Sequence, residues 1–262
     1  MTARTAARKA GAMERPQILI TGAARRIGAV LARAFAGAGW HVVVHVHRLS
    51  DEARAFTASL PSAELVACDL LDGDAALAMI EQLAGKFDDW RMLVNCAAVF
   101  VPDSAEAIDP AVFAEAITVN AETPTRMAQA YLARARSPEG RRVIQFLDQK
   151  LLNPNPDFFS YTMAKHAFSA SVRMLAMAHA GSPDRIYGLA PGAMLASFDQ
   201  QPEEHEVSGR MNLLGRLTEP QELADAALWL AQGWLASGET LYVDSGQHLL
   251  SQSRDVLYLA RQ

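Results

Sequence analysis

The stretch SYTMAKH holds two residues whose types and spacing can do chemistry, Tyr161 and Lys165. On a helix, residues four apart lie on one face, so a phenol and an ammonium group would be neighbours. A cation within a few ångströms favours the phenolate and brings a group with a pKa of about 10 closer to neutral pH. The pair therefore predicts a general acid and base, with Lys165 assisting Tyr161.

Residues at three other places in the chain accompany this pair. Asn95 ends the strand-like run RMLVN, Asn120 lies in ITVNAETP, and Pro191 and Gly192 follow the run RIYGLA. A YxxxK sequence alone occurs by chance in many chains, so the prediction depends on the presence of these other residues.

A glycine turn between a predicted strand and a predicted helix, TGAARRIG, is suited to binding phosphate. Gly22 directly follows the apolar strand and Gly28 lies in the first turn of the helix, the context that a dinucleotide-binding turn requires. Arg26 stands where such turns usually carry a middle glycine. With Arg25 it adds positive charge at a helix N-terminus, where free N–H groups already attract a pyrophosphate.

The end of the second strand, HVHR, decides which dinucleotide fits. An NAD site would place an acid there to bind the ribose hydroxyls, but no acid occurs before Asp51. Arg48 is suited to a 2′-phosphate instead, so the sequence predicts NADP(H). Two alternatives remain open: Arg48 could be a surface charge at a strand end, and Asp51 could cap a helix.

Short β-rich runs alternate with helical patterns along the whole chain, which is typical of βαβ units. The runs are apolar on both faces, as in a parallel sheet that helices cover on each side. We therefore predict an α/β fold: a single Rossmann-type domain, residues 17–262, with a doubly wound parallel sheet of seven strands. Residues 193–217, polar and punctuated by Gly and Pro, form either a lid over the substrate or a solvated loop. The predicted helices cover residues 27–38, 51–60, 72–86, 110–136, 158–180 and 220–232.

The composition excludes several classes of protein. A net charge of −5 provides no basic surface for nucleic acid, and no apolar run reaches the roughly 18 residues that span a membrane. Cys68 and Cys96 are the only cysteines, which predicts no disulfide framework and a reducing, cytoplasmic location. Residues 1–16 are predicted to be a flexible tail with a second start at Met13, and an organelle-targeting segment is the alternative.

From TGAARRIG to LYVDSG the chain resembles the short-chain dehydrogenase/reductase family. The resemblance implies that Tyr161 is the acid/base, that Lys165 binds the nicotinamide ribose and lowers the pKa of the phenol, and that Asn120 holds a proton-relay water. It also implies that Asp69 contacts the adenine, where the alternative is an Asp at a helix start. The predicted cofactor contacts are Gly22, Arg25, Arg26, Ile27, Gly28, His47, Arg48, Asp69, Leu70, Asn95, Ala97, Pro191 and Gly192.

Position 148, thirteen residues before Tyr161, departs from the family pattern. Most members carry a serine there that hydrogen-bonds the substrate carbonyl, whereas this chain has Asp148. An ionised carboxylate would repel the alkoxide that forms when a ketone is reduced. Reduction of a C=N bond develops positive charge at nitrogen, which a carboxylate stabilises, and a carboxyl group with a raised pKa could pass a proton to Tyr161. The alternative is a loop Asp that makes turn hydrogen bonds.

The pattern is similar to the pteridine reductase branch of the family, which includes bacterial dihydromonapterin and dihydrofolate reductases. The shared features are the arginine in TGAARRIG, the strand end HVHR, the acid at position 148 and YTMAK. The resemblance implies that Arg26 reaches toward phosphate and pterin and that Phe100 stacks on the pterin ring, whereas Phe100 packing under the lid is the alternative. Cys96 and Ala98 replace an asparagine and a hydroxyl of that branch, so the identity of the reduced ring stays open.

Three smaller features complete the expectations. His45 and His47 lie two apart on one strand face without a third ligand, so no metal site is predicted. The apolar run 256–259 near the C-terminus is expected to pack in a subunit interface. The family resemblance implies a homotetramer formed through the helices that carry Asn120 and Tyr161.

Together these observations predict an NADPH-dependent reductase that transfers hydride to the C=N bond of a pterin or dihydrofolate-like ring. One alternative is an NADPH-dependent carbonyl or 3-oxoacyl reductase of the same fold. Another is a non-catalytic binding protein that senses NADP(H), against which the intact Tyr161, Lys165 and Asn120 argue. The predicted catalytic residues are Asp148, Tyr161, Lys165 and Asn120, and the predicted substrate contacts are Arg26, Phe100, Asp148 and Tyr161.

Overall fold

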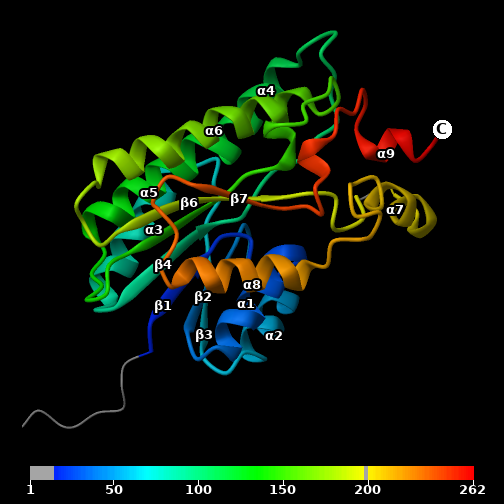
Figure 1. Cartoon of the computed structure of the whole chain (residues 1–262). Helices are drawn as coiled ribbons and strands as arrows, with labels where there is room; N and C mark the ends of the chain where they lie inside the picture. Colours follow the sequence, from blue (N-terminus) through cyan, green and yellow to red (C-terminus); the bar gives the residue numbers. More distant parts are fainter. Residues whose placement is uncertain (1–14, 198–199) are drawn as a thin grey trace, which may run out of the picture.

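One parallel sheet of seven strands forms the centre of the computed structural model, which describes residues 15–197 and 200–262 (Figure 1). Most of the predicted tail, residues 1–14 with Met13, lies outside this range. The strand order is β3-β2-β1-β4-β5-β6-β7. The strands are β1 (Gln17–Ile20), β2 (His41–Val46), β3 (Ala63–Ala67), β4 (Trp90–Asn95), β5 (Arg142–Phe146), β6 (Arg185–Pro191) and β7 (Thr240–Val243).

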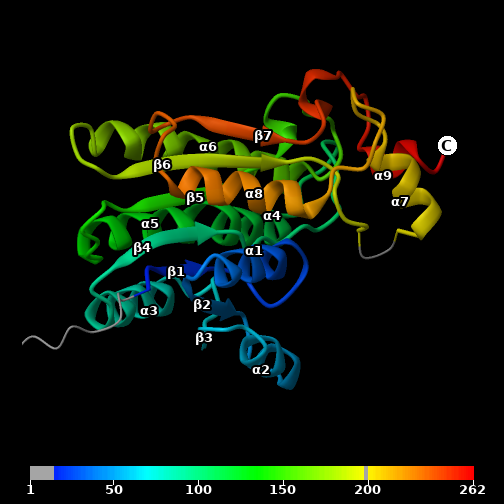
Figure 2. The ribbon, with the colours of Figure 1, turned by 60° about the horizontal axis from the view of Figure 1, so that its bottom comes forward.

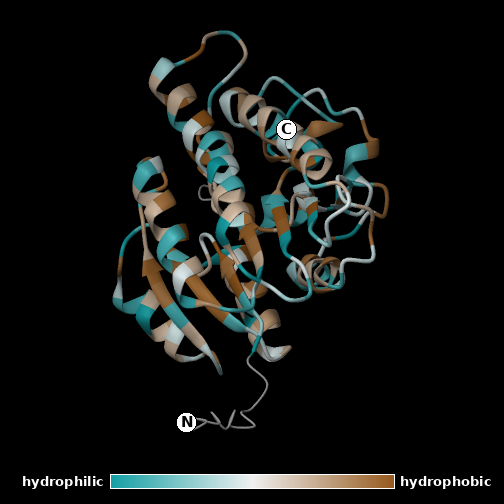
Figure 3. Ribbon diagram, turned by 90° about the vertical axis from the view of Figure 1, so that its left-hand side faces the viewer, coloured by the Kyte–Doolittle hydropathy of each residue, from teal (hydrophilic) through white to brown (hydrophobic). Residues whose placement is uncertain are grey.

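The middle of the sheet is buried on both faces, which is why its strands read as continuous apolar runs. Every residue of β1 and β5 is buried, and the hydropathy colouring shows hydrophobic strands between the helices (Figure 3). The chain places β2 and β3 on one side of β1 and β4 to β7 on the other. Open α/β sheets bind their ligands in the crevice at such a switch point, beyond the carboxyl ends of the strands.

Helices cover the sheet on both faces (Figures 1 and 2). Because both layers pack on parallel strands, the predicted α/β class with a doubly wound seven-stranded sheet is confirmed. One layer consists of α3 (Gly73–Lys86), α4 (Pro110–Ile117), α5 (Thr123–Arg134) and α6 (Phe159–Ala178), and the other of α1 (Arg26–Gly37), α2 (Asp51–Ala58) and α8 (Pro220–Ala231).

The helix predicted over 110–136 is interrupted, which corrects that expectation. A π-helical turn, Thr118–Glu122, separates α4 from α5 and contains Asn120. Pro124 has no N–H to continue the α-helical ladder, which gives a physical reason for the break. Such π-turns are frequently found at functional sites.

Two short helices, α7 (Pro202–Gly209) and α9 (Val256–Leu259), lie side by side beyond the carboxyl ends of β6 and β7 (Figures 1 and 2). The sequence pattern of residues 193–217 did not indicate α7, because residues 202–209, PEEHEVSG, hold one large apolar residue and show no apolar helical face. The local signal is the carboxylate of Glu204, which accepts a hydrogen bond from the backbone N–H of Gln201 at the helix start.

The C-terminal run 256–259 packs against its own chain, and its expected role in a subunit interface stays a prediction. Val256 and Leu257 are buried, and Leu257 belongs to a cluster with Phe158 and Tyr161. This apolar run is therefore part of the wall around Tyr161.

Candidate active site

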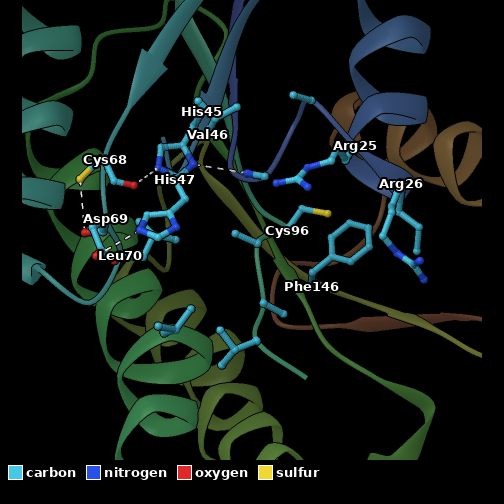
Figure 4. Close-up of a pocket in the computed structure, with 18 of the residues that line it drawn as sticks. Arg25, Arg26, His45, Val46, His47, Cys68, Asp69, Leu70, Cys96 and Phe146 are labelled. Carbon is cyan, nitrogen blue, oxygen red and sulfur yellow. Dashed lines mark hydrogen bonds and ion pairs between the residues drawn. The ribbon is translucent and has the colours of Figure 1, made fainter. Parts of the chain in front are cut away.

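A cavity of about 470 Å³ opens at the carboxyl ends of β1 to β4. In Figure 4, His47 and Asp69 lie on one side of it, and Arg25 and Arg26 lie on the other, at the start of α1. The cavity collects most of the predicted cofactor contacts, whereas Arg48, Asn95 and Gly192 do not line it. The predicted contacts that do line it are Gly22, Arg25, Arg26, Ile27, Gly28, His47, Asp69, Leu70, Ala97 and Pro191.

The glycine turn needs glycine at both outer positions. Gly22 has φ +67°, in the left-handed region that favours glycine. A Cβ on Gly28 would lie 2.3 Å from the carbonyl oxygen of Gly22, so any side chain there would push α1 away from β1. These constraints give the turn the close backbone approach that a pyrophosphate requires.

Arg26 occupies the place of the middle glycine and adopts a left-handed conformation that favours glycine, with φ +51°. A non-glycine residue adopts this region only at an energetic cost, which points to a functional contact of the Arg26 side chain. Its guanidinium Nη2 donates a hydrogen bond of 2.9 Å to the carbonyl oxygen of Ala196, in the segment after β6. Arg26 therefore connects the phosphate turn to the predicted lid.

His45 supports the glycine turn through a hydrogen bond to its backbone. The backbone N–H of Gly22 donates to its Nδ1 over 3.3 Å, and its Nε2 lies 3.0 Å from the carbonyl oxygen of Cys68. Because Nδ1 accepts, the ring is a neutral tautomer that carries its proton on Nε2. Burial lowers the pKa of His45 to about 4, which keeps the ring neutral at physiological pH.

Nε2 of His47 lies 3.2 Å from Oδ2 of Asp69 at the edge of the cavity. The backbone N–H of Leu71 donates to Asp69 and, together with His47, lowers the pKa of that carboxyl. Asp69 is not the cap of α3, because Asp72 accepts from the first turn of that helix. Arg48 lies exposed at the end of β2, outside the cavity wall but close enough to act electrostatically on Asp69.

The predicted acid/base residue meets the acid at position 148. The hydroxyl of Tyr161 donates a 2.8 Å hydrogen bond to Oδ2 of Asp148, and the backbone N–H of Lys150 donates to Oδ1 over 2.9 Å. Burial raises the pKa of Asp148, and burial together with the neighbouring carboxylate raises the pKa of Tyr161 well above its usual value. Tyr161 is therefore a neutral phenol that holds a proton ready for transfer.

Lys165 lies on the same face of α6 as Tyr161, as its spacing predicts. Its Nζ donates a 2.6 Å hydrogen bond to the carbonyl oxygen of Phe146 and lies 5.6 Å from the centre of the Tyr161 ring. Burial lowers the pKa of Lys165 to about 8. Desolvation and Asp148 raise the pKa of Tyr161 in this structure, and the expected lowering of that pKa by Lys165 stays a prediction.

The two predicted asparagines serve the backbone in the structure. The amide of Asn120 accepts from the N–H of Val99 and donates to its carbonyl oxygen, both over 2.9 Å, so the π-turn fixes the loop after β4. Asn95 is 2% exposed and donates to the carbonyl oxygen of Pro124 and to Gln145. Its side chain lies in the core, because β4 turns that face inward, which corrects its assignment as a cofactor contact.

A second cavity, of about 210 Å³, adjoins the first and shares Arg26, Ile27, Tyr161 and Pro191 with it. Asp148, Phe100 and Gly192 line this second cavity. Phe100 stacks on Phe158 with ring centres 3.9 Å apart and meets the Tyr161 ring edge-on at 4.7 Å. Tyr161 therefore lies between a dinucleotide-sized space and a smaller space for a second reactant, and Asp148 lines the smaller space only.

Sequence reasoning missed several residues of the second cavity. The wall includes Lys150 and Asp255, which form a buried ion pair of 2.7 Å, and His205 of α7. Lys150 lies two residues after Asp148 in DQK, a charged neighbour that could have drawn notice. Asp255 and His205 are distant in sequence, so only the fold brings them here. The structure as described over 15–197 and 200–262 groups no three metal-ligating side chains, and none of its helices is long and apolar enough to cross a membrane.

A family profile described as enoyl-(acyl carrier protein) reductase matches residues 22–248. The chain belongs to the short-chain dehydrogenase/reductase family. The structure is similar to that of the FolM alternative dihydrofolate reductase 1 from Brucella canis complexed with NADP, with a TM-score of 0.84 and 30% identity. That similarity covers 92% of this chain and 96% of the other.

Two curated short-chain dehydrogenases/reductases show how widely this family varies in substrate. A 3beta-hydroxysteroid dehydrogenase 1 from Eggerthella lenta is 25% identical and covers 88% of this chain and 93% of its own. Pteridine reductase 1 from Leishmania tarentolae is 24% identical and covers 89% of this chain and 96% of its own. The predicted membership of a pteridine-reductase-like branch is confirmed by this likeness and by that to the Brucella protein.

Proposed function

We propose that the protein reduces a C=N bond of a pterin or dihydrofolate-like ring. It is an NADP-dependent oxidoreductase, as the sequence predicted, and its similar structure from Brucella canis is complexed with NADP. When bound, NADPH would supply the hydride. The larger cavity, with Arg25, Arg26 and the Gly22 turn, fits the dinucleotide, and the smaller one fits the ring that is reduced.

The single observation that carries the proposal is the hydrogen bond between Tyr161 and Asp148. Reduction of a C=N bond takes one hydride at carbon and one proton at nitrogen, and the neutral phenol can donate that proton to nitrogen before the hydride arrives. A carboxylate beside the donor stabilises the positive charge of a protonated imine, whereas it would repel the alkoxide formed from a ketone. Asp148 can then take up a proton from water and pass it to the Tyr161 phenolate, because its own raised pKa eases its protonation.

Two further residues are suited to holding a flat heterocycle. Phe100 lines the smaller cavity and already stacks on Phe158, so one aromatic wall is preformed. Arg26 reaches both cavities and offers N–H donors at their boundary. In this proposal Tyr161 donates the proton, Asp148 tunes and resupplies it, and Lys165 and Asn120 keep their predicted roles at the ribose and the relay water.

The test measures loss of NADPH absorbance after addition of oxidised or dihydro forms of pterins and folates, and, in parallel, of ketones, 3-oxoacyl thioesters and quinones. The proposal expects turnover with a pterin or folate and about a hundredfold loss in Tyr161→Phe, with NADPH binding unchanged. Turnover of ketones alone would replace it with the carbonyl reductase reading, which the relationship to a hydroxysteroid dehydrogenase favours. Tight NADPH binding without any turnover would favour the alternative of a non-catalytic protein that senses NADP(H).

We propose a homotetramer as the assembly. The supporting observation is a row of exposed methionines on α6, Met163, Met174 and Met177, which are 46%, 68% and 69% exposed in the single chain. Large apolar side chains exposed together often mark a protein interface. Sedimentation of the purified protein tests this, and a monomer would contradict it.

A further inference from the structure

Lys150 is a buried cation close to Asp148 and Tyr161, which together form the acid/base pair of the proposed reaction. Its side chain is 3% exposed, and its Nζ lies 2.7 Å from Oδ2 of Asp255 and 2.9 Å from Oδ1 of Asn155. The ammonium also lies 5.8 Å from the ring centre of Phe158, the residue that Phe100 stacks on. A charge so deeply buried is stable only with such partners.

Lys150 touches the reacting groups through its backbone. Its N–H donates to Oδ1 of Asp148, the carboxylate whose other oxygen accepts from Tyr161. Residues 149–151 form a single 3₁₀ turn, so the side chain of Lys150 anchors the same turn that presents this N–H. Movement of Lys150 would therefore move the carboxylate that faces Tyr161.

Hydrogen bonds to the C-terminal segment fix Asp255, the partner of Lys150. Its Oδ1 accepts from the backbone N–H of Leu257, at the start of α9, and its own N–H donates to Asp157. Leu257 packs in the cluster that contains Phe158 and Tyr161. The ion pair thus joins the turn after Asp148 to the C-terminal wall of the smaller cavity.

Two further contacts join the same two segments. Asn153 and Gln252 bind each other reciprocally, over 2.7 Å and 3.0 Å. Arg254 forms a two-pronged pair with Asp157, with nitrogen to oxygen distances of 2.8 to 3.0 Å. Residues 150–157 and 252–255 are therefore joined by these three side-chain contacts and by the hydrogen bond from the N–H of Asp255 to Asp157.

We propose that Lys150 and Asp255 are positioning residues for the reductase: their ion pair fixes the turn whose N–H holds Asp148 against Tyr161. This inference rests on the proposed function, because it assigns the two residues to the acid/base pair of that reaction. Neither residue donates the proton itself. Both act through Asp148.

Charge gives the proposal a signature that packing alone lacks. The groups that act on Asp148 are the cations Lys150 and Lys165 and the phenol Tyr161. Asp148, Asp255 and Cys96 act on Tyr161, and Asp148 also acts on Tyr242. Loss of the Lys150 ammonium therefore raises the pKa of Asp148, and loss of the Asp255 carboxylate lowers the pKa of Tyr161. Removal of one member of the ion pair should therefore raise a pKa in the site, and removal of the other member should lower one.

The experiment compares Lys150→Met and Asp255→Asn with Arg136→Gln, a control that breaks an exposed ion pair with Asp88. Each protein is assayed for kcat and KM from pH 5 to pH 10, and the Asp148 carboxyl is titrated by carbon NMR, assigned from Asp148→Asn. We expect kcat to fall about tenfold or more in both variants, because misplacing a catalytic group by about 1 Å costs about a hundredfold. KM for NADPH should stay unchanged, and the control should match the wild type.

The pH data decide between positioning and mere structural support. The proposal expects the Asp148 titration to move upward by about one pH unit in Lys150→Met. In Asp255→Asn it expects the high-pH limb of the kcat profile, which reports Tyr161, to move downward. Unmoved titrations, or activity losses that only follow the folded fraction, would overturn it. Asp255→Asn keeps an oxygen for the N–H of Leu257, so it decides the matter alone if Lys150→Met does not fold. The NMR titration needs no turnover, so a wild type that reduces no pterin refutes the proposed function and leaves the positioning role testable.

Discussion

The phenol of Tyr161 points its hydroxyl at Asp148, thirteen residues earlier in the chain, over 2.8 Å. β5 and α6 create this relationship, because Asp148 follows the carboxyl end of β5 and Tyr161 lies in the first turn of α6. Phe158 stands between them at the start of α6 in a left-handed conformation, with φ +53°, and turns the chain into the helix. The result is a protonated phenol and a buried carboxyl that share one hydrogen bond.

Asp148→Ser should change which substrates are reduced. The substitution replaces a carboxylate, which repels an alkoxide, with a hydroxyl. Turnover of ketones should therefore rise, while kcat for pterins should fall by about a hundredfold. The measurement is kcat/KM for one pterin and one ketone in both proteins. Asp148→Asn is the matched control, since it keeps the shape and loses the charge. Equal losses on both substrates would contradict the assigned role of the carboxylate.

Arg26→Gly should separate backbone strain from side-chain function. Glycine adopts φ +51° without strain, whereas Arg26→Ala keeps the strain, so the glycine variant should unfold with about 1 kcal/mol more free energy than the alanine variant. Both lose the contact to Ala196, so both should raise KM for the substrate to a similar extent. Chemical denaturation and steady-state kinetics provide the readouts. An unchanged KM would mean that Arg26 does not serve the substrate.

Arg48→Ala should reduce the preference for NADPH. If the guanidinium binds the 2′-phosphate, its loss removes about 1.5–3 kcal/mol, which lowers kcat/KM for NADPH about ten- to a hundredfold and leaves NADH unaffected. Arg48 does not line the larger cavity in the structure, so this prediction is a direct test of its proposed role. Arg54→Ala, an exposed arginine on α2, is the control. Parallel losses with both dinucleotides would assign Arg48 to the surface.

His45 should make stability depend on pH in a defined window. A pKa lowered from 6.5 to about 4 corresponds to about 3 kcal/mol. Above pH 6.5 the histidine is neutral in both states and its full contribution is present. As the pH falls from 6.5 to about 4, the unfolded chain binds a proton that the folded protein does not, so stability is lost, and the loss ends below pH 4.

The measurement for His45 is the melting temperature of wild type and His45→Gln between pH 7 and pH 4. The wild type should lose about 6–10 °C more than the variant across this range. Glutamine can still accept from the N–H of Gly22, so the comparison isolates the titrating ring. Identical pH dependence in both proteins would contradict the buried neutral histidine.

Much of the fold was predictable because its signals are local. The strand runs, the turn around Gly22 and Gly28, and the helical spacing of Tyr161 and Lys165 each depend on residues close in sequence. The family resemblance, and no spacing rule, implied the approach of Asp148 to Tyr161, with a loop Asp that makes turn hydrogen bonds as the alternative. The break at Asn120 had a local cause too, Pro124, but the apolar pattern on either side of it suggested one continuous helix.

The remaining features depend on contacts that no short segment encodes. The pKa of Tyr161 is set by its burial and by Asp148, and burial follows from the packing of Leu257, nearly a hundred residues later. Asn95 looked like a ligand at a strand end, yet Pro124 and Gln145 draw its amide into the core. The pairing of Lys150 with Asp255 likewise arises only when the C-terminus folds back over the turn after Asp148.

The most direct test of the account is a crystal structure of the protein with NADP⁺ and a reduced pterin. The account predicts that the pterin stacks on Phe100 in the smaller cavity, with a ring nitrogen within hydrogen-bond distance of Tyr161 or Asp148 and the carbon beside it facing the nicotinamide. A pterin bound elsewhere, or an Asp148 carboxylate turned away from both the ring and Tyr161, would contradict it.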